Sequence, residues 1–299
     1  MKRSILFAAL LSAGAAQAQY QVSGSYWYGS DTERSTEQIT TLEGWANRSE
    51  TVDVGTRVTY TTNEDRYGTS TEGTDLRLLG SWTTHNLTVN GGVGVWDAAS
   101  KTTTLGNLDL FWKGITNTVV SAGLDRSGVA SIYNESGAVT FGRHIYRDRA
   151  YVAADYSNLN WGMGGQLNHD RYNDNNTRIS VDAKVWVSVV DGVSVYVKRR
   201  YWDNSNPYTG NYFSPERLDR TLVGVQARTR VAANTVLAGY VDTGRQRVDS
   251  ESKNAYNWKL QLDHSVTEQV DVTVAIGEDT TLSGNYKYRY GAVYATVRF

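Results

Sequence analysis

The segment RISVDAKVWVSVV, residues 178–190, alternates strictly between apolar and polar side chains. The apolar positions are the odd-numbered ones from Ile179 to Val189, and the even-numbered ones carry Arg178, Asp182 and Lys184 among others. A period of two places successive side chains on opposite faces of a β-strand. The segment therefore predicts a strand with one apolar face and one charged face.

The same alternation recurs in TLVGVQARTRV, residues 221–231, and in EQVDVTVAI, residues 268–276. Alternation alone fits both a soluble sandwich and a membrane barrel. Strands that cross the hydrocarbon layer at a tilt need about 10 residues, whereas sandwich strands average about 5 or 6. Because the alternating runs here are long, they favour an all-β, transmembrane, antiparallel up-and-down β-barrel.

Breaking the chain at turn signals gives sixteen expected strands, an even number that lets both chain ends lie on the periplasmic side. The expected upward strands lie near 20–30, 53–62, 87–96, 117–125, 160–170, 193–202, 235–246 and 268–277. The expected returning strands lie near 38–48, 73–83, 102–113, 149–157, 177–190, 218–231, 255–265 and 286–299.

The connections between these strands alternate in length, as in outer-membrane barrels with short periplasmic turns. Asp191-Gly192 is one of the short joins, whereas 126–148 and 203–217 are long ones expected to fold over or into the mouth. The second long join contains Pro207 and Pro215, the only two prolines. Since proline cannot donate to a sheet ladder, the rest of the chain is expected to be paired almost throughout.

Both ends of the sequence carry export signals. Lys2 and Arg3 precede an apolar run that ends in Ala16-Gln17-Ala18, which predicts a signal peptide over residues 1–18 and a barrel over 19–299. The last strand ends on Phe299, a terminal aromatic of the kind expected as the insertion signal of outer-membrane proteins. We expect the outer membrane of a Gram-negative bacterium, with its lipid, its lipopolysaccharide and the barrel-insertion machinery as partners.

Composition narrows the possible functions. Without residues 1–18 the chain has 28 basic against 31 acidic groups, a net charge of about −3, so no nucleic-acid partner is expected. Cysteine is absent, which leaves neither a disulfide framework nor a thiolate metal site. We expect no metal and no cofactor.

Aromatic residues near the strand ends are expected in two interfacial girdles. The girdle candidates are Tyr26, Tyr28, Trp82, Trp112, Tyr156, Trp161, Tyr201, Tyr240, Tyr256 and Trp258. Trp96, Trp186, Tyr196, Tyr290 and Tyr294 have the parity of inward-facing positions instead.

Sixteen strands enclose a space too wide for side chains alone to fill, so a pore or a plugged pore is expected. The inward-parity candidates for contact with a transported molecule are Arg178, Asp182, Lys184, Trp186, Tyr196, Lys198, Arg200, Arg220, Gln226, Arg228, Arg230, Lys259, Asp263, Tyr290 and Tyr294. Aromatic faces beside charged and amide groups suit a sugar polymer. A diffusion porin also carries lumenal charges of both signs, so composition leaves both alternatives open.

An enzymatic alternative centres on His169, which lies beside acidic residues near the outer leaflet, where a lipid hydrolase would need its base. A polar loop mouth explains the same residues, and we expect no catalytic residues. The neighbouring Asp170, Asn173, Asp174 and Asn175 carry oxygen ligands but lack the spacing and glycine of a calcium loop.

Two segments resemble a known family. NHDRYNDNNTR (168–178) and WDNSNPYTGNYFSPERLDR (202–220) are similar to the barrel domain of the exporters of poly-N-acetylglucosamine and cellulose and their small stand-alone relatives. The matching positions are Asn173 to Arg178 and the outer-loop motif Tyr212, Phe213, Ser214, Pro215, Glu216 and Arg217. The resemblance implies a channel associated with exopolysaccharide secretion and biofilm formation.

The large exporters also carry a periplasmic array of helical repeats ahead of the barrel, whereas the first strand here is expected almost at Gln19. Either a separate periplasmic repeat protein supplies that part, or the chain is a stand-alone relative. A general or substrate-selective porin is the alternative function. The sequence names neither the polysaccharide nor the oligomeric state.

Overall fold

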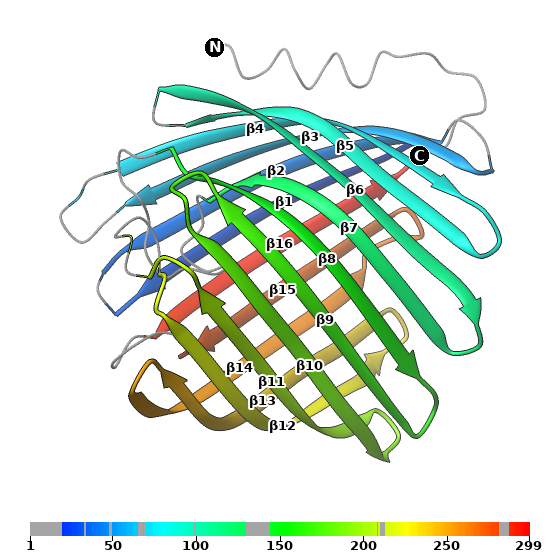
Figure 1. Cartoon of the computed structure of the whole chain (residues 1–299). Helices are drawn as coiled ribbons and strands as arrows, with labels where there is room; N and C mark the ends of the chain where they lie inside the picture. The colour runs from blue at the N-terminus through cyan, green and yellow to red at the C-terminus, as the bar shows by residue number, and fades with distance from the viewer. Residues whose placement is uncertain are drawn as a thin grey trace.

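The structure, a computed structural model, describes residues 20–32, 34–47, 50–64, 68, 70–98, 100–129, 144–207, 209, 213–280 and 287–299. These residues contain sixteen strands (Figure 1). The strands are β1 (Tyr20–Asp31), β2 (Thr36–Asn47), β3 (Val52–Glu64), β4 (Ser70–Thr83), β5 (Leu87–Ala98), β6 (Lys101–Ile115), β7 (Thr118–Gly128), β8 (Tyr146–Ser157), β9 (Trp161–Tyr172), β10 (Thr177–Val190), β11 (Val193–Asn204), β12 (Arg217–Ala232), β13 (Thr235–Val248), β14 (Glu251–Ser265), β15 (Val270–Asp279) and β16 (Tyr288–Arg298).

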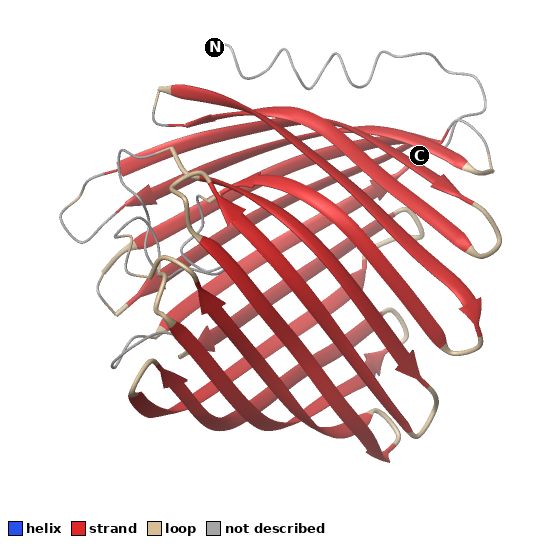
Figure 2. Cartoon of the chain, viewed as in Figure 1, coloured by secondary structure: helices blue, strands red, loops and turns tan. Residues whose placement is uncertain are grey.

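Each strand pairs antiparallel with its neighbours in the sequence, and β1 pairs with β16 to close the barrel (Figure 1). Strands make up the wall of the barrel, and loops and turns join them at its two ends (Figure 2). The closing register runs from Gln21 opposite Arg298 to Asp31 opposite Tyr288. At the seam the Phe299 amide donates to the Tyr20 carbonyl at 2.8 Å. Within the described residues, no helix is long and apolar enough to cross a membrane.

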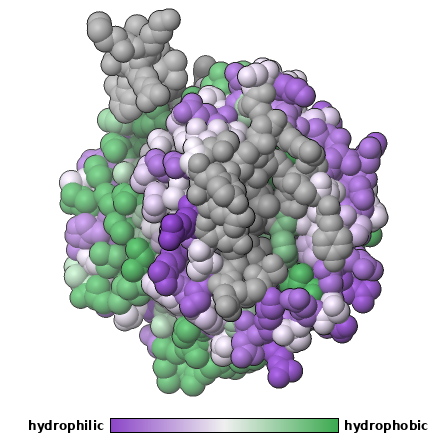
Figure 3. Space-filling view, turned by 90° about the vertical axis from the view of Figure 1, so that its left-hand side faces the viewer, coloured by the Kyte–Doolittle hydropathy of each residue, from purple (hydrophilic) through white to green (hydrophobic). Residues whose placement is uncertain are grey.

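The barrel is apolar outside and polar inside, the reverse of a soluble protein. Leu78 and Val93 are 62% and 63% exposed on the outer face, whereas Asp170 and Asn257 are buried on the inner one. Viewed onto the end with the longer connections, hydrophilic residues are prominent around this end, and hydrophobic residues are seen mainly at the left and lower edges of the molecule (Figure 3). An outward apolar face this extensive needs a hydrocarbon environment, because exposed to water it would be an aggregation surface.

The predicted fold class and number of strands are confirmed. Several strands extend further at the end with the longer connections than the sequence suggested: β4 begins at Ser70, β8 at Tyr146 and β14 at Glu251. In these extensions the residues on the outer face are polar, because the strands continue beyond the part of the barrel whose outer face is apolar. The alternation of apolar and polar residues that predicts a strand is therefore lost, although the backbone hydrogen bonds between the strands continue.

The periplasmic turns are short, as expected. Asp191-Gly192 joins β10 to β11, and Gly192 has a positive φ of 72°. A Cβ at this position would lie 2.3 Å from the Arg228 carbonyl oxygen. Both facts require glycine there. The expected signal peptide and the central part of the 126–148 connection lie outside the described residues.

The assignment of Tyr240 to an interfacial girdle was wrong. Tyr240 pairs with Gln226 and Lys259 on the inner face, so its ring lies in the lumen. The other nine girdle candidates have outward positions in the register, and Tyr26, Trp82 and Trp112 are among the exposed large side chains. Proximity to a strand end suggested a girdle position for Tyr240, but its parity decides the face on which it lies.

Candidate functional site in the barrel lumen

The lumenal wall formed by β10–β14 collects most of the residues that the sequence predicted to face inward. Lys184 lies opposite Lys198, and Trp186 opposite Tyr196, on β10 and β11. The register places all the candidates on the inner face: Arg178, Asp182, Lys184 and Trp186 on β10, Tyr196, Lys198 and Arg200 on β11, Arg220, Gln226, Arg228 and Arg230 on β12, Lys259 and Asp263 on β14, and Tyr290 and Tyr294 on β16.

Ion pairs hold several of these charges against the wall. The Arg200 guanidinium lies 2.5 Å from the Asp182 carboxylate, and Arg228 lies 3.5 Å from Asp263. The Lys198 ammonium lies 2.6 Å from the fully buried carboxylate of Asp242. Pairing of this kind offsets the cost of placing charges near a low-dielectric wall.

Three basic residues of the same wall have no acidic partner among the described residues: Lys184, Arg230 and Lys259. The Lys184 ammonium donates to the Gln226 amide oxygen at 2.7 Å and lies 4.3 Å from the centre of the Tyr196 ring. Lys259 lies beside Tyr240 in the register. This wall therefore carries surplus positive charge next to aromatic rings.

Inward aromatic rings lie across glycines of neighbouring strands. A Cβ on Gly162 would lie 2.6 Å from the Trp186 ring, and one on Gly224 would lie 2.6 Å from the Tyr196 ring. Tyr290 covers Gly277 in the same way and stacks on Trp27, with ring centroids 4.4 Å apart. The absent side chains let the rings lie flat, so they line the wall without closing the space that it surrounds.

Burial divides the predicted contact residues into two groups. Arg178 is 1% exposed, and Tyr196, Arg220 and Tyr290 are also buried. The Arg220 guanidinium donates to the Asn257 amide oxygen at 2.6 Å and lies 3.4 Å from Asp279. The buried group faces inward but braces the wall, so direct contact with a passing molecule falls to exposed residues such as Arg228, 63% exposed, and Tyr294.

Arg178 holds part of the outer-loop motif against the wall. Its guanidinium donates from Nη2 to the Phe213 carbonyl oxygen at 2.8 Å and from Nε to the Asn204 Oδ1 at 3.0 Å. The Asn204 amide in turn donates to the Pro215 carbonyl oxygen at 2.6 Å. The Arg178 guanidinium also lies 4.5 Å from the Trp202 ring centre. Phe213 contacts Trp202 edge to face, at 6.3 Å between centroids.

The outer-loop motif therefore divides in two. Phe213, Ser214 and Pro215 lie against the inner wall, with Ser214 and Pro215 buried. Glu216 is exposed, and Arg217 lies on the outer face, where it pairs with Asp203 at 3.1 Å. Tyr212 lies outside the described residues.

The structure separates His169 from its acidic neighbour. His169 is on the outer face of β9, in line with the exposed Leu167, whereas Asp170 is fully buried on the inner face. The Asp170 carboxylate accepts two hydrogen bonds from Arg149, at 2.7 and 3.0 Å. Across the described residues, no group of three or more histidine and acidic side chains is placed to hold a metal ion.

Two residues that organise this wall, Asp242 and Asn204, are not among the candidates predicted from the sequence. Asp242 accepts a hydrogen bond from the Tyr196 hydroxyl at 2.5 Å and one from the Asn257 amide at 2.8 Å, besides pairing with Lys198. Asn204 lies beyond the strand expected at 193–202, whereas β11 extends to Asn204. Parity along β13 would have identified Asp242, whereas nothing local marks Asn204.

No family model matches this sequence, and no curated protein matches it. Solved structures do match. A bacterial polysaccharide outer membrane secretin, 12% identical, superposes with a TM-score of 0.77 over 94% of this chain and 98% of that one. CdiB from Acinetobacter baumannii, 9% identical, gives 0.58 over 95% of this chain and 60% of that one. OccK11 from Pseudomonas aeruginosa, 7% identical, gives 0.52 over 94% and 96%.

At these identities the likeness establishes the fold. Together with the apolar outer face, it identifies the chain as a barrel of the Gram-negative outer membrane.

Proposed function

We propose that this protein is a passive outer-membrane channel through which a secreted polysaccharide passes along the barrel lumen. The main support for this proposal is the set of side chains on the inner wall of the barrel. Half-buried or exposed aromatic rings, Trp186 and Tyr294, occur there on the same face as the hydrogen-bonding groups of Gln226 and Arg228. A polysaccharide presents hydroxyl groups and apolar ring faces together, so it needs both kinds of partner.

Two further observations support a sugar polymer. The bacterial polysaccharide outer membrane secretin superposes over 98% of its own chain, so a fold of this size occurs in a protein of that description. The family-like outer-loop motif lies at the lumen mouth, attached through Arg178 to the wall that carries the aromatic rings. In this proposal residues 1–18 direct export, and the strand ending at Phe299 is read by the insertion machinery. A separate periplasmic protein delivers the polymer.

A diffusion porin is the second candidate, favoured by the exposed Arg228 and Arg230 and by the likeness to OccK11. Single-channel recording in planar bilayers separates the two. A polysaccharide channel is transiently blocked by oligosaccharides of its substrate class at concentrations that leave the bulk conductivity unchanged. Large conductance that stays open and unaffected by neutral, amino-sugar and uronate oligosaccharides would contradict the polysaccharide proposal and support the porin.

A further inference from the structure

Trp45 forms a flat platform on the inner wall near the periplasmic end of the barrel. A Cβ on Gly55 of the next strand would lie 2.8 Å from the Trp45 ring, so the ring lies across that glycine. Its indole N–H donates to Glu43 Oε1, and the other Glu43 oxygen accepts from the Arg57 Nε at 2.5 Å. One face of the ring is thereby fixed against the wall. The Trp45 side chain is half-buried, so the other face of its ring is open to the lumen.

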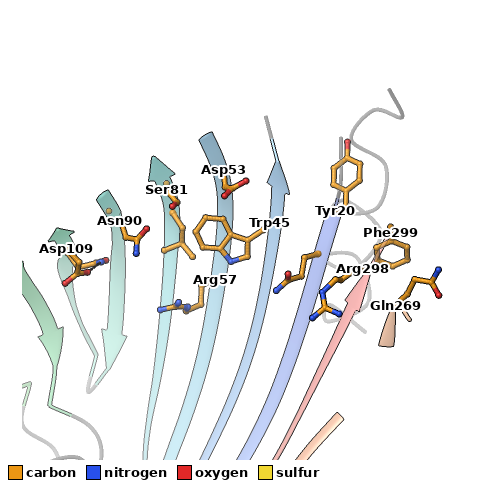
Figure 4. Close-up of a pocket in the computed structure, with 15 residues that line it drawn as sticks. Tyr20, Trp45, Asp53, Arg57, Ser81, Asn90, Asp109, Gln269, Arg298 and Phe299 are labelled. Atoms are coloured by element: carbon orange, nitrogen blue, oxygen red, sulfur yellow. Dashed lines mark hydrogen bonds between the residues drawn. The ribbon is translucent and has the colours of Figure 1, made fainter. Parts of the chain in front are cut away.

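A recess of about 860 Å³ opens beside this platform (Figure 4). The recess is lined by residues of β1 to β6, and two of its lining residues, Gly80 and Gly91, carry no side chain. Tyr20 and Phe299, the two ends of the described chain, are among its lining residues. The recess therefore lies at the periplasmic end, where a polymer delivered from the periplasm would first meet the wall.

A row of polar side chains lies next to the platform. Asp53, Ser81, Asn90 and Asp109 are directly opposite one another across β3, β4, β5 and β6. Neighbouring strands are about 4.8 Å apart, so the row presents polar groups at regular intervals. Asp109 accepts hydrogen bonds from Tyr151 and Asn107. The side chains of Asp53, Ser81 and Asn90 make no hydrogen bond or ion pair with any described residue, and all three are half-buried lining residues of the recess.

We infer that this recess is an entry subsite for a neutral or amino-sugar polymer, in which one sugar ring stacks on Trp45 while its hydroxyl groups bond to Asp53, Ser81 and Asn90. The inference rests on the proposed function. Aromatic faces pack well against apolar surfaces of matching size, and carboxylate and amide oxygens accept hydroxyl hydrogen bonds. A hydrogen bond from such a ligand stabilises half-buried polar groups without partners most, because these groups have already lost part of their hydration.

The charges of the recess decide between classes of polymer. The two guanidinium groups near it are occupied, since Arg57 pairs with Glu43 and Arg298 pairs with Asp271 at 2.7 Å. Asp53 has no basic partner among the described residues, so the surplus charge is negative. A polyuronate would be repelled at this position, whereas an uncharged or cationic hexose polymer would be accepted.

The test is single-channel recording on the full-length mature barrel, with cellohexaose, its N-acetylglucosamine counterpart and an oligouronate added to one side at a time. We expect neutral oligosaccharides to block from the periplasmic side, and Trp45→Ala to raise their dissociation rate up to about tenfold, as loss of an aromatic stacking contact predicts. Asn90→Ala should raise it about two- to tenfold through the lost hydrogen bond. Trp45→Phe, which keeps a ring, should have a smaller effect than Trp45→Ala.

Trp82→Ala is the matched control. Trp82 is on the outer face, next in sequence to Ser81 and 45% exposed, so its removal takes away an indole at the same level without touching the recess. Its blockade kinetics should equal those of the unmodified barrel. Thermal unfolding of each variant verifies that the barrel is intact.

The outcomes separate the two proposals. If the unmodified barrel is blocked by neutral oligosaccharides but Trp45→Ala and Asn90→Ala leave the dissociation rate unchanged, the entry subsite is refuted while the polysaccharide channel stands. Preferential blockade by the oligouronate refutes the assigned polymer class. If no oligosaccharide blocks the unmodified barrel from either side, the proposed function fails, and the subsite fails with it.

Discussion

Replacing Arg178 by methionine should release the loop segment Phe213–Pro215 from the inner wall while leaving the barrel closed. Arg178 is 1% exposed and donates hydrogen bonds to the Phe213 carbonyl and the Asn204 amide oxygen. Methionine keeps an unbranched apolar side chain but removes both donors and the positive charge. The ladder bonds of β10 are made by the backbone, so they are retained.

The magnitude follows from these contacts. Only the bond to the Phe213 carbonyl joins Arg178 to the loop, because Asn204 and Trp202 belong to β11. A hydrogen bond from a charged group contributes about 1.5–3 kcal/mol. The Asn204 to Pro215 bond and the contact between Phe213 and Trp202 remain in the variant. A loss of about 1.5–3 kcal/mol raises the population of the released loop about 10- to 100-fold.

Thiol accessibility measures this population. The sequence contains no cysteine, so Ser214→Cys introduces a single reporter at a position that is 3% exposed. A membrane-impermeant maleimide should label it slowly in the parent and about 10- to 100-fold faster with Arg178→Met. Arg199→Met is the control, because Arg199 lies on the outer face of β11 and pairs with Asp219 at 2.7 Å. Equal labelling rates with and without Arg178 would refute the anchoring role.

Four further predictions concern the barrel itself. Asp170→Asn leaves the half-buried Arg149 without the charge of its fully buried partner and should lower the free energy of unfolding by about 3–5 kcal/mol, measured by urea unfolding in lipid vesicles; an unchanged midpoint would argue against a stabilising role of this pair. Val185→Arg puts a charge on the outer face and should cost about 2–4 kcal/mol in the same assay, whereas Lys184→Arg on the inner face should cost much less. Gly192→Val forces a β-branched side chain into a left-handed turn and against a carbonyl, so the unfolding temperature should fall by several degrees; an unaltered temperature would show that the turn can rearrange. Deletion of Phe299 should reduce the amount of assembled barrel in the outer membrane, seen in membrane fractions, and normal assembly would exclude it as an insertion signal.

Alternation along the chain was sufficient to predict the fold because the two environments of a membrane barrel differ so strongly. In β10, Val185 has to face lipid and Lys184 has to face the lumen, so each residue reports its side directly. Sixteen such segments, an even count and short turns such as Asp191-Gly192 define the topology without any long-range information. The strand ends were predicted less accurately where the strands extend beyond the lipid. There the backbone pairing continues, but the outer face no longer needs apolar residues.

The candidate site was predicted only in part. Parity identified which residues face inward, but it could not tell that Arg178 is covered by the loop at Phe213 while Arg228 is exposed. Burial inside a barrel depends on side chains that come from strands and loops distant in sequence. The position of Tyr240 was wrong for a simpler reason, because distance from the strand end was given more weight than parity.

The sequence by itself determined which face of each strand meets lipid and how many strands close the barrel, since both follow from local alternation and from turn residues. Only the tertiary structure decided which inward side chains meet one another. The Trp45 ring lies flat because Gly55 on the next strand leaves room for it, and Asp53, Ser81 and Asn90 form a row because three separate strands pair in one register. Register is a property of the whole closed sheet, so the recess they line was outside the reach of any local pattern.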